Sequence, residues 1–212
     1  MKYKPIYWII SKPFVGKYLK KHFDKKSIKT IFKNAKAEYK RLLSRADDIG
    51  SDNPMASNLY FALVIVSFLT ANRDKITAEM LAEMIESTFN SRFLKKLMPL
   101  DLNREKDILF MKHRMLRASK WAAKHKNEHP ETWEINFDDN LHKDGSYYYF
   151  TKCPIAKFFK DNDMQDLTHM LCEIDYLAIK LAKGKLIRNC TLANGDAMCD
   201  FWIVGDKVKN PR

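Results

Sequence analysis

Residues 133–151, WEINFDDNLHKDGSYYYFT, decide the fold class of this 212-residue chain. From Trp133 to Phe137 apolar and polar residues alternate, which is the period of a half-buried strand. Asp144-Gly145 supplies turn residues, and the run from 147 to 151 is rich in residues that favour strands. The stretch therefore predicts a β-hairpin.

Two helices and a second hairpin are predicted after this stretch. Pro154 suits the first position of a helix, and the apolar spacing from about Asp163 to Lys183 is helical, with Gly184 as its stop. Asn194-Gly195 is typical of a two-residue hairpin turn. The order is then ββααββ, which indicates an antiparallel sheet.

The residues before this unit have a helical period. Apolar positions recur at three and four from Phe14 to Arg45, with Ser27 as a candidate cap for the longer of two helices. Further helices are predicted from Pro54 through Thr70, from a Thr77 cap to about Met98 with Phe93 on its apolar face, and from about Asn103 to Lys126.

The predicted fold class is therefore α+β, with N-terminal helices followed by a ββααββ unit with an antiparallel sheet. We expect residues 1–50 to form a basic helical N-terminal extension. Residues 51–212 would form an α+β domain, with helices at 54–127 and a sheet-and-helix module at 131–205.

The chain is basic, with 38 Lys and Arg against 26 Asp and Glu and a formal net charge of +12. Much of the excess lies between Lys2 and Arg45. Such a run can follow a phosphate backbone, but a solvated helix surface is its commoner meaning. Neither a zinc-finger spacing nor a glycine-rich phosphate loop accompanies it, so we expect no nucleic-acid partner.

No membrane partner is expected either. The longest apolar run, Leu59 to Leu69, is shorter than the roughly 20 residues that cross a bilayer, and Ile6 to Ile10 is too short for a secretory signal. We therefore expect a cytoplasmic protein with reduced thiols. The sequence specifies no oligomeric state.

All four cysteines lie in the last third of the chain, at Cys153, Cys172, Cys190 and Cys199. Cys153 directly precedes Pro154, so its thiol would lie at or beside the N-cap of a helix. Unpaired amides and the helix dipole lower a thiol's pKa there, which favours a thiolate. The alternative is a small buried residue at the end of a strand.

Cys172 and Asp175 are three residues apart and share a face of the next predicted helix. His169 precedes Cys172 by three residues, so a thiol, a carboxylate and an imidazole would point into one pocket. A lone helical histidine is, however, more often a surface or core residue.

The closing hairpin has a conditional register. If Asn194-Gly195 form a two-residue turn, Cys190 opposes Cys199 and Arg188 opposes Phe201. Alternation then places these four side chains on one face, with Asn189, Thr191 and Asp200 on the other. A loop longer by one residue would shift the pairing.

Zinc ligands usually occur in pairs about two to four residues apart, whereas Cys190 and Cys199 are nine apart. The spacing gives no support for a metal site, although separate elements can converge on one ion. The cofactor stays open: thiol chemistry requires none, and a divalent metal is the alternative.

An ordered set of residues resembles the L-2-amino-thiazoline-4-carboxylic acid hydrolase family. The set is Cys153-Pro154, Leu171-Cys172-Glu173-Ile174-Asp175, Arg188, Thr191-Leu192, Gly195-Asp196 and Cys199-Asp200-Phe201. The resemblance covers Tyr147 to Trp202 and, more loosely, the helices from about Asn58. Cys190 and His169 do not match the family pattern.

The resemblance implies a hydrolase that acts on a small-molecule substrate, opening a cyclic amidine such as L-2-amino-thiazoline-4-carboxylate to N-carbamoyl-L-cysteine. A thiolate at Cys153 or Cys172 would attack the C=N carbon, with Asp175 moving protons. Arg188 would pair with the substrate carboxylate, and the remaining substrate-binding residues would be Thr191, Cys199 and Asp200.

Two alternatives stay open at this point. The same reaction is accessible to a metal-activated water in place of the thiolate. The second alternative is a non-catalytic sensor module, in which the same thiols contact a small molecule or a metal.

Overall fold

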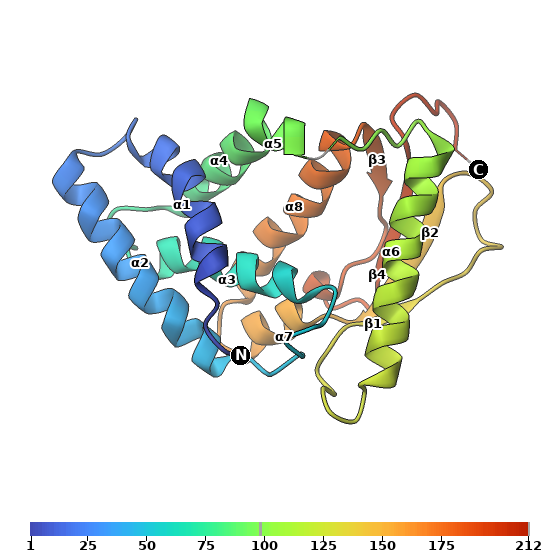
Figure 1. The fold of residues 1–212 in the computed structure, drawn as a ribbon, viewed down its shortest axis with the longest axis horizontal. Helices are drawn as coiled ribbons and strands as arrows, with labels where there is room; N and C mark the ends of the chain where they lie inside the picture. Colours follow the sequence, from blue (N-terminus) through green and yellow to red (C-terminus); the bar gives the residue numbers. More distant parts are fainter. Residues whose placement is uncertain (98, 212) are drawn as a thin grey trace.

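The structure is a computed structural model that describes residues 1–97 and 99–211 (Figure 1). In these residues, helices come first along the chain. They are α1 (Pro5–Leu19), α2 (Lys25–Arg45), α3 (Ala56–Thr70), α4 (Ala78–Phe89), α5 (Arg92–Leu97) and α6 (Glu105–Lys124).

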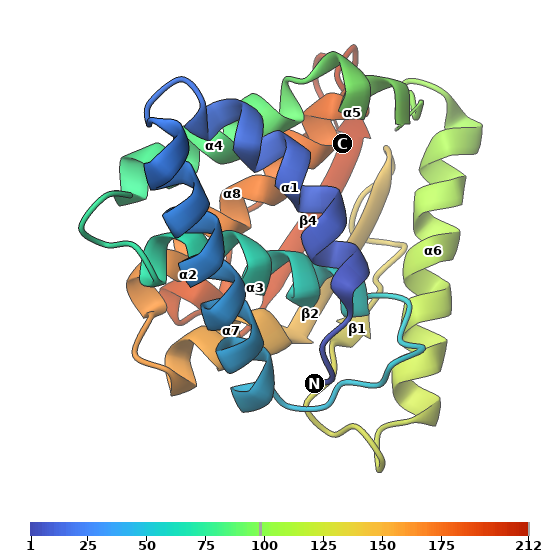
Figure 2. The same cartoon turned by 60° about the vertical axis from the view of Figure 1, so that its left-hand side comes forward.

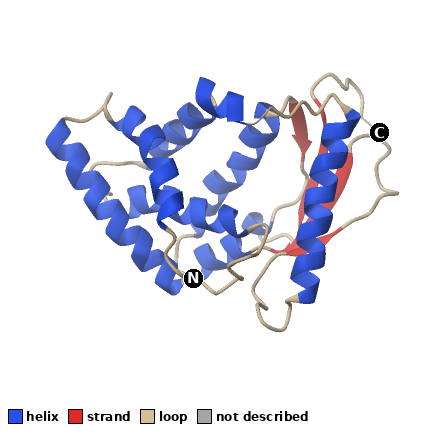
Figure 3. Ribbon diagram, viewed as in Figure 1, coloured by secondary structure: helices blue, strands red, loops and turns tan. Residues whose placement is uncertain are grey.

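The remaining elements follow in the predicted order ββααββ. They are β1 (Glu134–Asn136), β2 (Ser146–Lys152), α7 (Pro154–Asp161), α8 (Thr168–Leu181), β3 (Gly184–Ile187) and β4 (Cys199–Gly205). The strands form one antiparallel sheet in the order β1-β2-β4-β3. The α+β fold class is therefore confirmed, and Figure 3 shows the strands gathered at one end of the molecule.

Two helices lie along the edges of this sheet. Helix α6 contacts β1 and β2, whereas α8 contacts β3 at the other edge. Figure 2 shows α6 standing apart from the other helices. The sheet is consequently flanked by α6 and α8. The loop before α3 contacts α6, because the Trp121 indole donates to Asp52 at 3.1 Å.

The register of the closing hairpin is the predicted one, since Ile187 opposes Trp202 and Leu186 opposes Ile203. The two-residue turn is wrong. The ladder ends at Ile187, and the connection contains a short 3₁₀ helix, η2 (Leu192–Asn194), followed by Gly195 with a φ of +89°. The predicted pairing is correct although the predicted turn is not, because the register depends on which face of the strands is buried.

Some predicted helix ends are also wrong. Asp24, not Ser27, caps α2 by accepting from the N–H groups of Lys26 and Ser27. The predicted helix at 163–183 begins with a separate 3₁₀ turn, η1 (Gln165–Leu167), and its α-helical part ends at Leu181.

Gly184 does not end α8 but begins β3. A Cβ at Gly184 would lie 2.5 Å from Leu102 Cδ1, so this glycine allows a close approach between elements. Lys183 takes the left-handed backbone conformation in its place, with a φ of 56°.

The Thr77 cap is confirmed, because its hydroxyl accepts from the Met80 N–H. The apolar face predicted to continue to Phe93 is wrong, however. Helix α4 ends at Phe89, and Phe93 lies on the separate helix α5 with 61% of its surface exposed.

The main core lies between α1, α2 and α3. The Trp8 and Phe68 rings stack at 5.5 Å, and the Phe32 ring meets Phe68 edge-on at the same distance. Buried residues continue from here through α7 and α8 to the sheet. The division at residue 50 stays a prediction.

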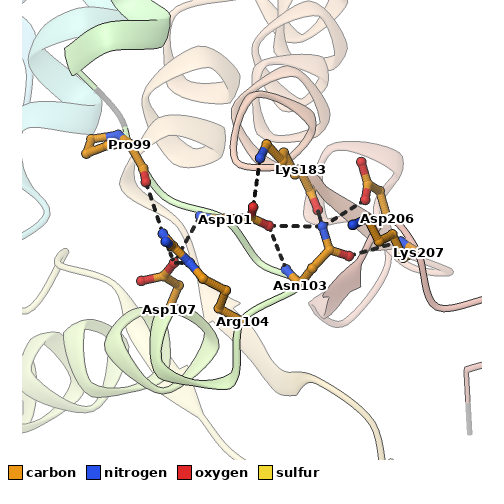
Figure 4. Close-up of polar contacts among 8 residues, drawn as sticks. All are labelled: Pro99, Asp101, Asn103, Arg104, Asp107, Lys183, Asp206 and Lys207. Atoms are coloured by element: carbon orange, nitrogen blue, oxygen red, sulfur yellow. Dashed lines mark hydrogen bonds and ion pairs between the residues drawn. The ribbon is translucent and has the colours of Figure 1, made fainter.

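A polar network fastens the segment before α6 to the end of the sheet (Figure 4). The Asp101 carboxylate accepts from Lys183 Nζ at 2.7 Å and from Asn103 Nδ2 at 3.0 Å. Asn103 Nδ2 also donates to Asp206 at 2.9 Å. These hydrogen bonds, led by the one from Lys183, lower the pKa of Asp101 below its ordinary value. Asp101 thus fixes where α6 begins relative to β3.

In the described ranges, no helix combines the length and the apolar character that crossing a bilayer requires.

Candidate functional site

An ion pair joins the end of the sheet to α8. Arg188 Nη2 lies 2.8 Å from Asp175 Oδ2, and Arg188 Nε donates to the Asp200 carbonyl oxygen at 3.2 Å. The guanidinium lies over the Phe201 ring, 4.0 Å from its centroid. Only 2% of the Arg188 side chain is exposed, against 42% for Asp175. The pair therefore presents a carboxylate to solvent and keeps its cation inside.

This geometry gives Arg188 a protein partner. The substrate carboxylate expected at Arg188 would have to compete with Asp175 for a guanidinium that is already buried. Arg188 is accordingly placed to orient Asp175.

Desolvation raises the pKa of the Asp175 carboxyl above its ordinary value, and the charge of Arg188 opposes this rise. The side chain is nevertheless 42% exposed, so solvent reaches it. A raised pKa also makes it a stronger base than a free aspartate.

Three of the four thiols lie near this carboxylate. Cys172 lies on α8, Cys153 is the N-cap of α7, and Cys199 begins β4. Burial, together with the charge of Asp175, raises the pKa of each of these thiols. The structure thus places Cys153, Cys172 and Cys199 in the neighbourhood of the Asp175–Arg188 pair, and their joint action on a substrate stays a prediction.

The prediction of a thiolate at Cys153 is wrong, because the pKa of this thiol is raised instead of lowered. The residue does cap α7, and the N–H groups of Ile155 and Ala156 favour the charged form, but burial outweighs them. It raises the pKa of Cys153 to about 11. Burial followed by the charge of Asp175 raises the pKa of Cys172 to about 12. Both thiols are therefore protonated at neutral pH.

Cys199 has a structural contact of its own. Its sulfur accepts from the Leu192 N–H at 3.1 Å, and its side chain is buried opposite Phe150 of β2. This contact ties η2 to the first residue of β4.

Thr191 and Asp200 shape the same connection. The buried Asp200 carboxylate accepts from the N–H groups of Asn189 and Cys190 at 2.9 and 2.7 Å. Thr191 caps η2 through the Asn194 N–H at 3.2 Å. Their predicted contact with substrate stays a prediction, and their observed contacts hold the loop.

Cys190 and His169 lie outside the group. The predicted placement of Cys190 on the face of Cys199 is wrong, because Cys190 lies beside Asp200 and Asp196, whose charges act on it. The ladder ends before Cys190, so strict alternation no longer applies there. His169 is exposed on α8.

Tyr148 is a site residue that sequence reasoning missed. It lies on β2 opposite Phe201, and the two rings stack at 5.1 Å. Burial followed by the charge of Asp175 raises the pKa of the phenol, while the charges of Arg188 and Arg114 lower it. Tyr148 thus lies within reach of both the ion pair and α6. Its alternation with Phe150 was the signal that could have placed it on the inner face.

Elsewhere, a hollow of about 180 Å³ lies between the start of α3 and the middle of α6. Its lining includes Arg114, the residue whose charge acts on Tyr148.

A metal site does not emerge from the same residues. Within residues 1–97 and 99–211, no three His, Cys, Asp or Glu side chains are grouped so that they could hold an ion. The described thiols and carboxylates accordingly do not fit the ligand set that a metal-activated water needs.

These features define a class: an α+β protein with protonated thiols and a carboxylate of raised basicity at the junction of helix and sheet. Residues 57–203, more than half of the chain, match the family described as L-2-amino-thiazoline-4-carboxylic acid hydrolase, and the chain belongs to this family. No significant match to a curated protein or to a solved structure was found.

Proposed function

We propose that the protein hydrolyses a small cyclic amidine such as L-2-amino-thiazoline-4-carboxylate to N-carbamoyl-L-cysteine. The observation that supports this most directly is the partly exposed Asp175 carboxylate, held by Arg188 and close enough to Cys172 for its charge to raise the pKa of that thiol. An amidine is a cation when protonated, so a partly exposed carboxylate complements it in charge and in hydrogen bonding.

Asp175 acts as the general base in this proposal, and Cys172 acts as the nucleophile. The Cys172 thiol starts protonated, and Asp175 is three residues away on the same face of α8. Asp175 takes the thiol proton while sulfur bonds to the carbon that carries the amino group. The bond from this carbon to the ring sulfur then breaks, and the ring sulfur receives the proton.

Water completes the reaction. It adds to the carbon now linked to Cys172 and gives a proton to Asp175. The bond to Cys172 breaks, and Asp175 returns its proton to the Cys172 sulfur. The second proton of the water passes from the new hydroxyl to the former ring nitrogen, and the carbon becomes the carbonyl of N-carbamoyl-L-cysteine. One water is consumed, and Cys172 and Asp175 end as they began.

Arg188 supports Asp175 without contacting substrate. Its buried guanidinium holds one carboxylate oxygen, which leaves the other free to accept a proton. It also limits how far desolvation raises the pKa of the Asp175 carboxyl, which favours the charged form that a general base requires.

The test is turnover of L-2-amino-thiazoline-4-carboxylate by the full chain and by Asp175→Asn, Cys172→Ser and Cys153→Ser. We expect Asp175→Asn to lower kcat by about 10²- to 10⁴-fold, as for other general bases. Glu173→Gln is the matched control, because Glu173 is an exposed carboxylate on the same helix. It should leave kcat within about twofold.

Covalent catalysis is tested separately by rapid quenching and mass spectrometry. A substrate-derived mass on the peptide containing Cys172 is expected, and Cys172→Ser should abolish both adduct and turnover. Full activity in Cys172→Ser would mean that Asp175 activates water directly. Wild-type protein that turns over no cyclic amidine yet binds one tightly would instead support the sensor function.

A further inference from the structure

Helix α1 has an apolar stripe on the outside of the molecule. Ile6, Ile9 and Ile10 are 50%, 61% and 45% exposed, and Pro13 is exposed as well. Positions three and four apart lie on one face of a helix, so these four side chains form one stripe. The other face packs into the core through Trp8, and Figure 2 shows α1 crossing in front of α3. Helix α1 is therefore apolar on two faces, of which the described residues cover one.

Helix α5 extends this stripe. The Phe93 ring lies 5.9 Å from the Phe14 ring of α1, and a hollow of about 840 Å³ is lined by both rings and by Pro13. Phe93 and Leu97 are four apart on α5 and are 61% and 60% exposed. The exposed apolar surface thus continues from α1 onto α5. We call it the apolar patch, and its members are Ile6, Ile9, Ile10, Pro13, Phe93 and Leu97.

The segments that carry the apolar patch are cationic. Residues 1–23 contain six Lys and no acid, and residues 91–97 contain two Lys, one Arg and again no acid. The exposed cations on α1 and α5 are Lys12, Lys17, Arg92, Lys95 and Lys96. The Glu83 carboxylate of α4 contacts α1 through the Tyr18 hydroxyl, and Tyr18 belongs to the buried face of the helix. The patch is therefore apolar in its middle and positively charged around its edge.

The partner of this surface has to offer apolar groups surrounded by negative charge. The surface of an anionic bilayer does so, with acyl chains beneath phosphate and carboxylate headgroups. A second copy of the chain would bring two cationic edges together, and a phosphate backbone would leave the isoleucines in water. Lysine is depleted in protein interfaces, whereas its diffuse charge suits a layer of mobile headgroups. We propose that the apolar patch docks the protein on a membrane surface that contains anionic lipids, with the isoleucines of α1 entering the interface.

This inference is independent of the proposed function, because none of the patch residues belongs to the candidate site. The expectation of no membrane partner depended on the length of the apolar runs in the sequence. That length decides whether a segment can span a bilayer, and it sets no limit on a helix that lies along the interface.

The first experiment measures sedimentation of the full chain with vesicles of phosphatidylcholine alone and of phosphatidylcholine mixed with phosphatidylserine. We expect binding to the mixed vesicles and much weaker binding to the neutral ones. Raising the salt from about 0.1 M to about 1 M shortens the Debye length from about 10 Å to about 3 Å and should weaken the binding. No binding to the mixed vesicles, or equal binding to both kinds, would overturn the proposal.

The apolar contribution is tested with Ile6→Gln combined with Ile9→Gln. The partition coefficient onto the mixed vesicles should fall at least about 10-fold, because two apolar side chains no longer leave water. Ile9→Gln alone should show a smaller loss, and denaturant midpoints verify that both proteins fold. Leu141→Gln is the matched control, since Leu141 is 53% exposed in the loop between β1 and β2, at the other end of the molecule from α1 (Figure 1). It should bind as wild type does, and wild-type binding by the folded isoleucine variants would overturn the proposal.

The charge contribution is tested with Lys95→Gln combined with Lys96→Gln. Binding to the mixed vesicles should fall about 10- to 30-fold, as for two cations removed from an anionic surface. The control is Lys124→Gln combined with Lys126→Gln, which removes two exposed cations at the end of α6. This pair should change binding by less than about twofold. An equal loss in both pairs would show a general attraction of the basic chain and overturn the docking surface.

Two further measurements test the other occupants of the patch. Sedimentation velocity gives the oligomeric state without lipid, and a wild-type dimer that becomes a monomer in the isoleucine variant would mean that a second copy covers the patch. Titration with polyglutamate tests an acidic protein partner, and tighter binding of this peptide than of the mixed vesicles would overturn the proposal. A monomer that prefers the vesicles supports it.

Discussion

The helices before residue 82 and the ββααββ unit after residue 131 differ in what they bury. Of the twelve largest fully buried side chains in the described residues, eleven belong to the first region and one, Phe159, to the second. The second region instead buries polar or ionisable groups, among them Arg188 and Asp200. The large apolar side chains and the buried ionisable groups therefore lie in different parts of one core.

The charges are divided in the same way. Residues 1–45 contain fourteen Lys and Arg and two acids, which accounts for the whole formal charge of +12, while the rest of the chain is balanced. In the first region ionisable groups lie mostly at the surface, whereas the second buries the Arg188 guanidinium and the Asp200 carboxylate. Substitutions in the two regions should thus affect different measurements.

The largest effect is expected from a cavity in the first region. Phe68→Ala removes a ring that stacks on Trp8 and is fully buried, so we expect unfolding to become easier by about 3–5 kcal/mol. Chemical denaturation measures this loss, and kcat of the remaining folded protein should not change. Ile9→Ala, on a helix of the same layer but 61% exposed, is the control and should cost under about 0.5 kcal/mol.

A smaller loss of stability with a change in chemistry is expected from Arg188→Gln. The cost should be about 1–3 kcal/mol, below that of a fully buried pair, because Asp175 is 42% exposed and can be solvated. Arg188 lowers the pKa of Asp175, so its removal raises that pKa. A base acts above its pKa, and the acidic limb of the kcat profile should therefore move to higher pH. A shift to lower pH would contradict the assignment.

Most of the fold could be predicted from the sequence, because the spacing of hydrophobic residues and the pairing of strands both depend on which residues are buried. The ββααββ order and the register at Ile187 follow from that pattern. The ends of elements were less readable. Asp24 and Ser27 are both good caps, and only the path of the chain into α2 decides between them.

The sequence predicted a grouping of candidate site residues but not their protonation states. The grouping of Cys153, Cys172 and Asp175 followed from motif order, yet the pKa of Cys153 did not. A helix N-terminus lowers a thiol pKa only when burial does not outweigh it, and burial depends on how residues distant in sequence pack around the thiol.

A gain of stability is expected from Tyr39→Phe in the first region. The Tyr39 hydroxyl is buried and has no hydrogen-bond partner in the part of the chain that the structure describes. Removing it ends an uncompensated desolvation, so stability should rise by about 1 kcal/mol. Tyr18→Phe is the matched control, because the Tyr18 hydroxyl donates to Glu83 at 2.7 Å and its loss should not stabilise. Denaturant midpoints compare the two variants, and a loss in Tyr39→Phe would indicate a bound water.

The smallest effect separates the two candidate caps of α2. Asp24→Ala removes the acceptor of two backbone N–H groups and should lower Tm by about 2–4 °C, whereas Ser27→Ala should lower it less. These hydrogen bonds, led by that of the Ser27 N–H, lower the pKa of Asp24. Its contribution is therefore present above the unfolded pKa of about 3.9 and is lost as pH falls through the lower folded value. The Tm difference between wild type and Asp24→Ala should shrink on that descent, and a constant difference would mean that the side chain acts by packing instead of by charge.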